Sequence, residues 1–239
     1  MNHRIVAITG GAGALGSALA KALVGKGYKV ALLDSDNAKD RLQALVKALG
    51  PDSAHAHAGD LATPEAWTSA LTATKSALGG LPTDAALIAG GWAGGVPLHE
   101  AKDDTAYEHM MRTNVDTAYR GLRALLPAMV AAKRGSIVVV GSRAVERPWT
   151  STGSAAYAAA KAAVVTMAQT AAQEVLEHGV RINAILPSTM DTPANRAGMP
   201  DADPARWVSL DSAAGVIAFL LSEEARDVSG AAIPVYGRS

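Results

Sequence analysis

The residues best suited to chemistry in this sequence are a tyrosine and a lysine four positions apart, Tyr157 and Lys161, in an alanine-rich segment. Alanine favours helix, and on a helix this spacing puts both side chains on one face. An ammonium group beside a phenol favours the phenolate, so we expect Lys161 to lower the pKa of Tyr157 until it can exchange a proton near neutral pH. The same pair is also typical of an exposed helix surface, so its meaning depends on the elements around it.

Ser142 adds a hydroxyl group to this pair. It follows an apolar run, residues 137–140, that is typical of a buried strand. We therefore expect Ser142 at the carboxyl end of a strand, where open parallel sheets bind their ligands. The three side chains together could hold a substrate oxygen and move a proton to or from it.

A second motif lies near the amino terminus. An apolar strand, residues 4–9, runs into Gly11-x-Gly13-x-x-Gly16, and a helix and a second strand, residues 28–33, follow. This order is typical of the dinucleotide-binding unit, in which glycines let the backbone approach a pyrophosphate at the amino end of the helix. The motif therefore predicts a nucleotide-binding site. The alternative interpretation is a turn with a purely structural role.

Asp34 ends the second strand, 18 residues after Gly16. Its carboxylate can accept hydrogen bonds from the ribose hydroxyls, whereas a 2′-phosphate would place negative charge beside it. No compensating cation is evident, because Gly13 occupies the turn and Ser35 and Asp36 follow Asp34. The sequence therefore predicts NAD as the cofactor in preference to NADP.

Strand-like and helix-like segments alternate through the rest of the chain. About seven strands alternating with helices predict an α/β fold: a single doubly wound Rossmann-type domain, residues 1–239, with helices on both faces of a parallel sheet. A proline-rich segment at about 187–210 is expected to be the substrate loop. The other expected strands are 53–58, 85–89, 137–140, 180–186 and 231–235, and the other expected helices are 37–49 with an Asn37 cap, 64–78, 103–132 with strain near Pro127, 154–177 and 211–221.

The composition narrows the class of protein. The 239 residues carry no net charge and no cysteine, so nothing indicates a nucleic-acid or membrane partner, a disulfide or thiolate chemistry. No apolar run reaches the roughly 18 residues of a spanning helix, and the first strand leaves no room for a signal peptide. We expect a soluble cytoplasmic protein. His55 and His57, near Asp60, are interpreted as packing or solvated side chains, so no metal site is predicted.

Several further segments match one family. Thr9-Gly10-x-x-x-Ala14-x-Gly16 is similar to a known cofactor turn, and Ser229-Gly230 is similar to a Thr-Gly pair before the last strand. With these motifs the chain resembles the short-chain dehydrogenase/reductase family over essentially its whole length. The resemblance implies a catalytic tetrad of Asn114, Ser142, Tyr157 and Lys161. It also implies cofactor contacts at Gly10, Gly13, Ala14, Leu15, Asp34, Asp60, Leu61, Ala89, Gly90, Tyr157, Lys161, Pro187 and Thr192.

The resemblance implies a role for each group. Asp60 and Leu61 would contact the adenine, and residues 187–192 would frame the nicotinamide. Tyr157 would be the acid or base and Lys161 would bind the nicotinamide ribose. Ser142 would hydrogen-bond the reacting oxygen, and Asn114 would hold a water in the proton path. The expected assembly is a homodimer or homotetramer that pairs helices 103–132 and 154–177, whose long apolar faces exceed what one sheet face covers.

Two features depart from the family pattern. The usual Asn-Asn-Ala-Gly after the fourth strand is here Leu87-Ile88-Ala89-Gly90, so the hydrogen-bonded support beneath the cofactor is missing. The segment between Ser142 and Tyr157 is slightly longer than is common, so Ser142 needs a different loop path.

The favoured function is an NAD(P)-dependent oxidoreductase that transfers a hydride between nicotinamide and a carbonyl, hydroxyl or C=N substrate. One alternative is an enzyme similar to quinonoid dihydropteridine reductases, which segments 89–95 and 186–203 resemble. Trp92 could then stack on a flat substrate or pack at a rim, and Arg196 could bind an anionic or carbonyl group or form a surface ion pair. An alternative of another class is a nucleotide-sensing protein with the same fold but no turnover.

Overall fold

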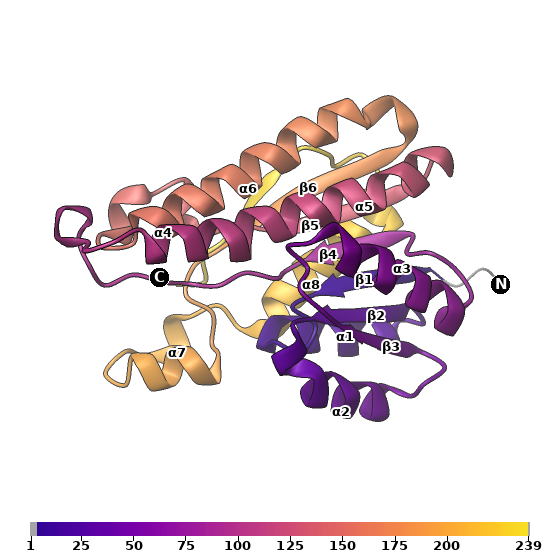
Figure 1. Cartoon of the computed structure of the whole chain (residues 1–239), viewed down its shortest axis with the longest axis horizontal. Helices are drawn as coiled ribbons and strands as arrows, with labels where there is room; N and C mark the ends of the chain where they lie inside the picture. The colour runs from indigo at the N-terminus through magenta and orange to yellow at the C-terminus, as the bar shows by residue number, and fades with distance from the viewer. Residues whose placement is uncertain (1–3, 239) are drawn as a thin grey trace.

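Seven parallel strands form one sheet in the computed structural model, which describes residues 4–238 (Figure 1). Their spatial order is β3-β2-β1-β4-β5-β6-β7, so the direction of winding reverses between β1 and β4. This confirms the predicted doubly wound α/β fold, in which ligands bind at the carboxyl ends of the strands near the reversal. The strands are β1 (Ile5–Thr9), β2 (Lys29–Asp34), β3 (Ala54–Ala58), β4 (Asp84–Leu87), β5 (Gly135–Val140), β6 (Val180–Pro187) and β7 (Ala232–Val235).

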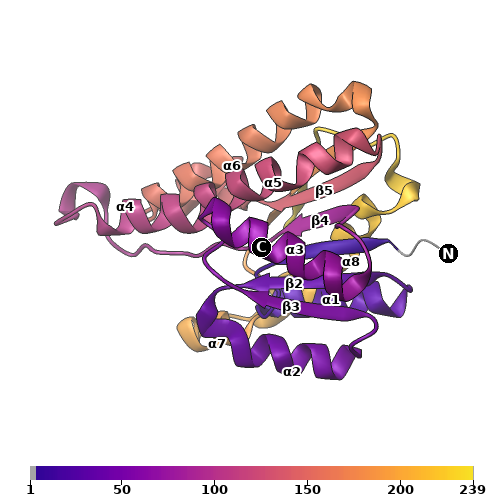
Figure 2. The ribbon, with the colours of Figure 1, turned by 45° about the vertical axis from the view of Figure 1, so that its right-hand side comes forward.

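Helices cover both faces of this sheet (Figures 1 and 2). One face packs against α1 (Ala14–Gly25), α2 (Lys39–Leu49) and α8 (Leu210–Leu221). The other packs against α3 (Pro64–Leu78), α5 (Thr117–Ala131) and α6 (Ala155–Glu174). Two short helices, α4 (Thr105–Met110) and α7 (Pro193–Gly198), lie beyond the carboxyl ends of the strands (Figure 1). No helix within residues 4–238 is long and apolar enough to cross a membrane.

Two buried apolar clusters lie on the two faces of the sheet. Ile8 and Leu19 belong to the first, with α1 and α8, and Trp67 and Leu122 belong to the second, with α3 and α5. Because both faces are covered, inner strands such as β1 and β5 are buried along their whole length and have continuous apolar sequences. The sheet is therefore a rigid base for the groups at its carboxyl edge.

The long helix predicted at 103–132 is divided by an irregular turn. A π-helical turn, Met111–Asp116, separates α4 from α5. The Asn114 amide donates to the Met110 carbonyl at 3.0 Å and helps to hold this widened turn, a feature that is frequent at functional sites. The sequence predicts strain at Pro127 instead, but this proline lies inside an uninterrupted α5.

Some local boundaries also differ from the predicted ones. The Asn37 cap is wrong, because a 3₁₀ turn, Asp36–Ala38, precedes α2 and the cap position makes no side-chain hydrogen bond. Helix α6 ends at Glu174, a few residues earlier than predicted. The segment expected to be a loop after β6 contains α7, whose amino end is capped by the Thr192 hydroxyl accepting from the Asn195 N–H at 3.1 Å.

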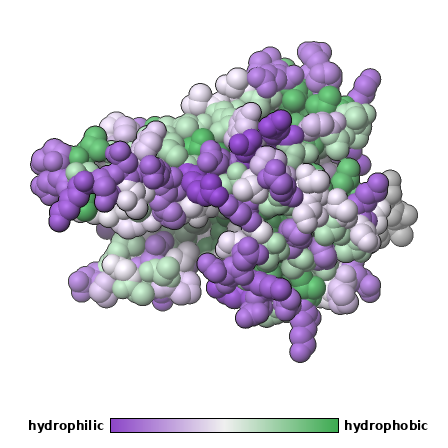
Figure 3. Space-filling model, viewed as in Figure 1, coloured by the Kyte–Doolittle hydropathy of each residue, from purple (hydrophilic) through white to green (hydrophobic). Residues whose placement is uncertain are grey.

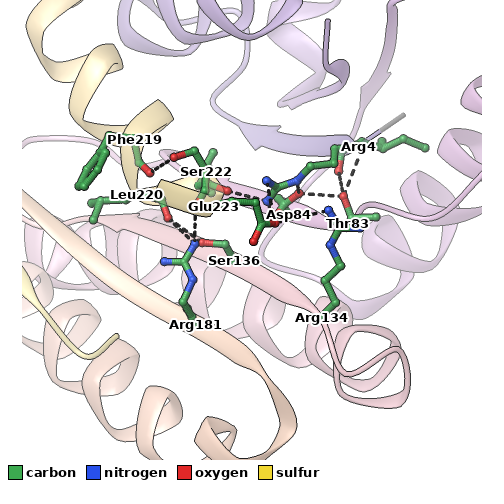
Figure 4. A network of polar contacts seen from close by, with 12 residues as sticks. Arg4, Thr83, Asp84, Arg134, Ser136, Arg181, Phe219, Leu220, Ser222 and Glu223 are labelled. Atoms are coloured by element: carbon green, nitrogen blue, oxygen red, sulfur yellow. Dashed lines mark hydrogen bonds and ion pairs between the residues drawn. The ribbon is translucent and has the colours of Figure 1, made fainter. Parts of the chain in front are cut away.

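A cleft of about 410 Å³ lies at the amino ends of the strands, on the edge away from Ser142. Figure 4 shows the network there: Arg4 forms a bidentate ion pair with Asp84, at 2.8 and 2.5 Å, and donates to the Leu221 carbonyl at 2.6 Å. Arg181 donates to the Leu220 carbonyl at 2.8 Å, so two arginines satisfy carbonyls at the end of α8. These groups hold the strands to α8, and we interpret the cleft as structural.

Candidate active site

Tyr157 and Ser142 meet at the carboxyl end of β5. Tyr157 lies in the first turn of α6, and Ser142 lies two residues beyond the end of β5. The Ser142 hydroxyl faces the Tyr157 phenol closely enough to affect its pKa. The Ser142 oxygen accepts from the Ala144 N–H at 3.2 Å, and the serine is only 9% exposed, so its position is fixed by the backbone.

Lys161 lies one turn further along α6, and its ammonium group donates to the Val140 carbonyl at 2.9 Å. Burial lowers the pKa of Lys161 to about 8. Burial also raises the pKa of Tyr157, and the Ser142 hydroxyl offsets this only in part. The expectation that Lys161 brings the pKa of Tyr157 below its usual value is therefore wrong, because desolvation of the phenol has the larger effect.

Asn114 reaches the same place from the π-helical turn. It is 1% exposed, and its amide exchanges two hydrogen bonds with the Gly91 backbone, both at 3.3 Å. A Cβ on Gly90 would lie 2.5 Å from Asn114 Oδ1 and 3.2 Å from Lys161 Nζ. Asn114 and Lys161 thus converge on Gly90, where only glycine fits, and all four residues of the predicted tetrad lie around one end of β5 and α6.

The glycine turn lies at the end of β1. Gly10 has a left-handed backbone, with φ +65°, and a Cβ on Gly16 would lie 2.2 Å from the Gly10 carbonyl oxygen. Gly13 precedes α1, and no side chain of residues 4–238 caps the amino end of this helix. The first-turn N–H groups, which include those of Ala14 and Leu15, therefore offer a site for an anion.

Asp34 is held against the glycine turn. Its Oδ2 accepts from the Ala12 N–H at 3.0 Å, and its Oδ1 accepts from the Ser35 N–H at 2.8 Å. The turn itself is tied to β2 by the Gly11 N–H, which donates to the Leu33 carbonyl at 3.1 Å. The carboxylate therefore has a defined orientation at the edge where the fingerprint predicts a ribose.

Asp60 and Leu61 follow β3 at the same edge. Asp60 accepts from the Ala62 N–H at 3.1 Å and forms an ion pair with Arg112 of the π-helical turn. Leu61 is 5% exposed, and its carbonyl accepts from the Trp67 indole at 3.0 Å. The sequence does not single out Arg112, because the pair joins residues 52 positions apart and nothing in the local pattern marks it.

Ala89 and Gly90 lack the asparagine pair that usually precedes them in the family, and other contacts hold this segment. The Thr9 hydroxyl accepts from the Ala89 N–H at 3.0 Å and ties β4 to β1. Leu87 is 4% exposed within the second apolar cluster, and Ile88 packs against the first. Packing and one hydrogen bond therefore support the strand end.

Residues 188–209, which follow Pro187 at the end of β6, form the segment that we call the cover. Its Arg196 makes a bidentate ion pair with Asp191, at 2.6 and 2.8 Å, and this hydrogen bond lowers the pKa of Asp191. Of the two interpretations of Arg196, the ion pair is therefore the one observed. Thr192 is used as the α7 cap, with its hydroxyl facing the Asn195 N–H.

Two loops meet at the rim of the site. The Gly95 N–H donates to the Gly153 carbonyl at 2.9 Å, so the glycine-rich segment after β4 touches the segment before α6, which contains the 3₁₀ turn Pro148–Ser151. These loops carry Trp92 and Trp149, which are 63% and 72% exposed, so Trp92 is not a packed rim residue. Figure 3 shows the surface hollowed between the lobe that carries α4 and the lobe that carries α7.

A dinucleotide fits the residues at this edge. No side chain caps α1 at Gly13 among the described residues, so a pyrophosphate would meet the backbone N–H groups of the first helical turn. Asp34 supplies acceptors for a ribose, and the buried Lys161 supplies a cation close to Gly90. These residues would hold such a cofactor with its nicotinamide end toward Tyr157.

The chain matches known proteins over nearly its whole length. Residues 4–202 match the family model described as short chain dehydrogenase. A 2,5-dichloro-2,5-cyclohexadiene-1,4-diol dehydrogenase of Sphingobium indicum is 32% identical, with 98% of this chain and 95% of that protein covered. A levodione reductase of Leifsonia aquatica is 29% identical, with 98% and 93% covered. The structure of a 3-ketoacyl-(acyl-carrier-protein) reductase from Brucella melitensis complexed with NADH has a TM-score of 0.86 at 26% identity, with 99% and 98% covered.

These similarities favour neither a dihydropteridine reductase nor a nucleotide-sensing protein without turnover. They agree with the glycine turn and with the convergence of Ser142, Tyr157 and Lys161 at the carboxyl edge of the sheet. The chain therefore belongs to the short-chain dehydrogenase/reductase family and is an NAD(P)-dependent oxidoreductase.

Proposed function

We propose that this enzyme transfers a hydride between NAD(H) and the carbonyl or hydroxyl carbon of a small uncharged molecule, with Tyr157 exchanging the proton. The observation that carries the proposal is the convergence of Ser142 and Tyr157 at the carboxyl end of β5, with the buried Lys161 one helical turn away. The nicotinamide supplies or accepts the hydride, and the protein supplies orientation and the proton.

The four side chains would divide the work. Ser142 would hydrogen-bond the reacting oxygen, and Tyr157 would give it a proton or take one from it. Lys161 would bind the nicotinamide ribose. Asn114 would keep the Gly90–Gly91 backbone in place, which its hydrogen bonds to Gly91 support, and hold a water in the proton path.

The protonation state of Tyr157 bears on the direction of the reaction. Burial raises its pKa, so the phenol is the resident form at neutral pH and can donate to a carbonyl oxygen. Oxidation of an alcohol needs the phenolate as the acceptor, so its rate should rise with pH. The form of Tyr157 that carbonyl reduction requires is therefore the one present near pH 7.

The proposed cofactor is NAD(H) in preference to NADP(H). The carboxylate of Asp34 is oriented by the Ala12 N–H, and its position would repel a 2′-phosphate. Lys39 and Arg41, the first cations that follow Asp34 in the sequence, are exposed, and neither makes a side-chain hydrogen bond or ion pair among the described residues. The cofactor loop therefore offers a phosphate little support.

The rim favours an uncharged substrate. Arg196 of the cover is occupied by Asp191. The other arginine of the cover, Arg206, donates to a backbone carbonyl near the carboxyl terminus. The exposed rim side chains Trp92 and Trp149 are aromatic. Exposed aromatic rings can stack on a flat ring system. A cyclic ketone is thus the first choice, and a quinonoid dihydropterin is the second candidate because Trp92 is free to stack.

A panel assay tests the proposal. Purified protein is mixed with NADH and, in turn, with cyclic ketones, quinones and quinonoid dihydropterin, and the loss of nicotinamide absorbance is followed. We expect turnover with at least one ketone or quinone. NADH binding without hydride transfer across the whole panel would contradict the proposal and favour the nucleotide-sensing alternative. Turnover with the dihydropterin alone would make the second candidate the function.

The proposed assembly is a cytoplasmic homodimer or homotetramer. Family resemblance supports pairing through α5 and α6, and Tyr119 on α5 is 48% exposed in the single chain. Light scattering at micromolar protein should give a mass of two or four chains. A single-chain mass would contradict this.

A further inference from the structure

The carboxyl-terminal tail, residues 236–238, lies between two segments that flank the site. Toward one side, the Tyr236 hydroxyl donates to Glu146 Oε2 at 2.6 Å, and the Arg147 guanidinium carbon lies 5.2 Å from the centre of the Tyr236 ring. Glu146 therefore binds the hydroxyl of Tyr236, and the Arg147 cation lies over its ring.

Glu146 belongs to a tight turn that begins at Ser142. The Ala144 N–H donates to Ser142 Oγ at 3.2 Å, the Val145 N–H donates to the Ser142 carbonyl at 3.0 Å, and the Glu146 N–H donates to the Arg143 carbonyl at 3.1 Å. These bonds make residues 142–146 one rigid unit. An anchor on Glu146 is therefore also an anchor on Ser142.

Toward the other side, the tail binds the cover. The Ser188 hydroxyl donates to the Tyr236 carbonyl at 2.7 Å, and the Arg238 N–H donates to the Arg206 carbonyl at 3.0 Å. Gly237 has φ +63°, and its Cβ would lie 3.1 Å from the Arg206 carbonyl oxygen. The tail thus follows a close path against the cover that only glycine permits at its centre.

From this geometry we propose that Tyr236 is a positioning residue, which holds the turn that carries Ser142 at a set distance from the cover. The proposal rests on the proposed function, because it assumes that Ser142 orients the reacting oxygen. The hydroxyl of Tyr236 acts through Glu146 on the serine, and its backbone acts through Ser188 on the cover. Burial and the Glu146 carboxylate raise the pKa of Tyr236 to about 12, so the phenol remains a donor at every working pH.

Tyr236→Phe tests the proposal because it removes one hydroxyl and keeps the ring beneath Arg147. We expect kcat to fall about tenfold, since small displacements of an orienting group are costly to catalysis, with the Kd for NADH within about twofold of wild type. Glu146→Ala should reproduce this loss, and Glu146→Gln, which keeps an acceptor, should restore most of kcat. The double variant Tyr236→Phe/Glu146→Ala should lose no more than either single variant, because one contact is removed in all three.

Tyr28→Phe is the matched control. The centre of the Tyr28 ring also lies beneath an arginine, 5.4 Å from the guanidinium carbon of Arg4. Tyr28 is at the amino edge of the sheet, away from the site, so kcat and KM should not change in this variant. Wild-type kcat in Tyr236→Phe, or additive losses in the double variant, would overturn the proposal. A fall in kcat matched by a fall in thermal stability and in NADH affinity would also overturn it, since it would show a general loss of structure. Tyr157→Phe distinguishes failure of the proposed function from failure of this proposal. Full activity of Tyr157→Phe would contradict the proposed function, independently of the kcat of Tyr236→Phe.

Discussion

The carboxylate of Asp34 accepts a hydrogen bond from the Ala12 N–H at 3.0 Å, so the end of β2 and the glycine turn are joined by one side chain. The second oxygen accepts from the Ser35 N–H, which leaves the carboxylate with a single orientation. A selector for the cofactor needs this kind of fixed charge. The contact therefore makes Asp34 the residue on which the choice between NADH and NADPH should depend.

Substitution of Asp34 should shift cofactor preference toward NADPH. At about 5 Å and an effective dielectric of about 20, repulsion of a 2′-phosphate is roughly 3 kcal/mol per unit charge before screening. This corresponds to about a hundredfold preference for NADH in the wild type. Asp34→Asn keeps an acceptor for Ala12 and removes the charge, so the kcat/KM ratio of NADH to NADPH should fall in it as well as in Asp34→Ala.

Asp36→Ala is the control for this experiment, because it removes an exposed carboxylate two residues further on. The ratio should stay as in the wild type. A wild-type preference for NADPH, or an unchanged ratio in both Asp34 variants, would show that Asp34 is not the selector.

The buried Lys161 should make stability depend on pH. Its folded-state pKa of about 8 lies below the ordinary 10.5, so between these values the unfolded chain holds a proton that the folded chain has released. Stability therefore rises with pH in this window and is constant on either side of it. Across the whole window the free energy of unfolding should increase by about 3 kcal/mol. Lys161→Met lacks the titrating group and should not show this increase.

Urea unfolding of wild type and Lys161→Met at pH 7, 8, 9 and 9.5 measures this difference. The wild type should gain free energy of unfolding relative to the variant across the series. Other groups are common to both proteins and cancel in the difference. Parallel stability curves would mean that Lys161 titrates normally in the folded protein.

Removal of the Asp84 carboxylate should cost more stability than removal of any exposed acid near it. Asp84 is 1% exposed and forms the bidentate pair with Arg4, so Asp84→Asn removes the buried carboxylate that balances a half-buried guanidinium, at a cost of about 3 kcal/mol. Glu223→Gln is the matched control: its side chain is 72% exposed and lies 3.4 Å from Arg4, so we expect less than about 1 kcal/mol.

Denaturant midpoints at fixed protein concentration test both variants. The Kd for NADH should stay unchanged in the folded protein, because this pair lies at the edge of the sheet away from the site. Equal losses in Asp84→Asn and Glu223→Gln would contradict the account of this network.

Local patterns predicted most of this fold. Apolar runs in the sequence predict the strands, including the one that ends at Asp34. The helical period of 3.6 residues predicts that Tyr157 and Lys161 lie on one face of a helix. All seven strands lie within a few residues of their predicted bounds. Seven parallel strands between two helical layers follow from that alternation.

What the sequence did not predict depends on contacts between distant residues. The ion pair of Arg112 with Asp60 and the contact of Tyr236 with Glu146 join segments that no local pattern relates. The π-helical turn is held by Asn114, whose amide bonds its own helix as well as Gly91. The shift of the Tyr157 pKa was predicted with the wrong sign, because charge proximity is visible in a helical spacing and desolvation is not.

Tyr157→Phe should nearly abolish hydride transfer, because Tyr157 is the proposed proton donor. The variant keeps the ring on α6 and removes only the hydroxyl that faces Ser142. With the best ketone of the panel, kcat should fall by about a thousandfold, the range of a lost acid catalyst, while the Kd for NADH stays within about twofold of wild type. Tyr28→Phe serves as the control and should keep full activity. A Tyr157→Phe enzyme with near-normal kcat would show that Tyr157 is not the proton donor.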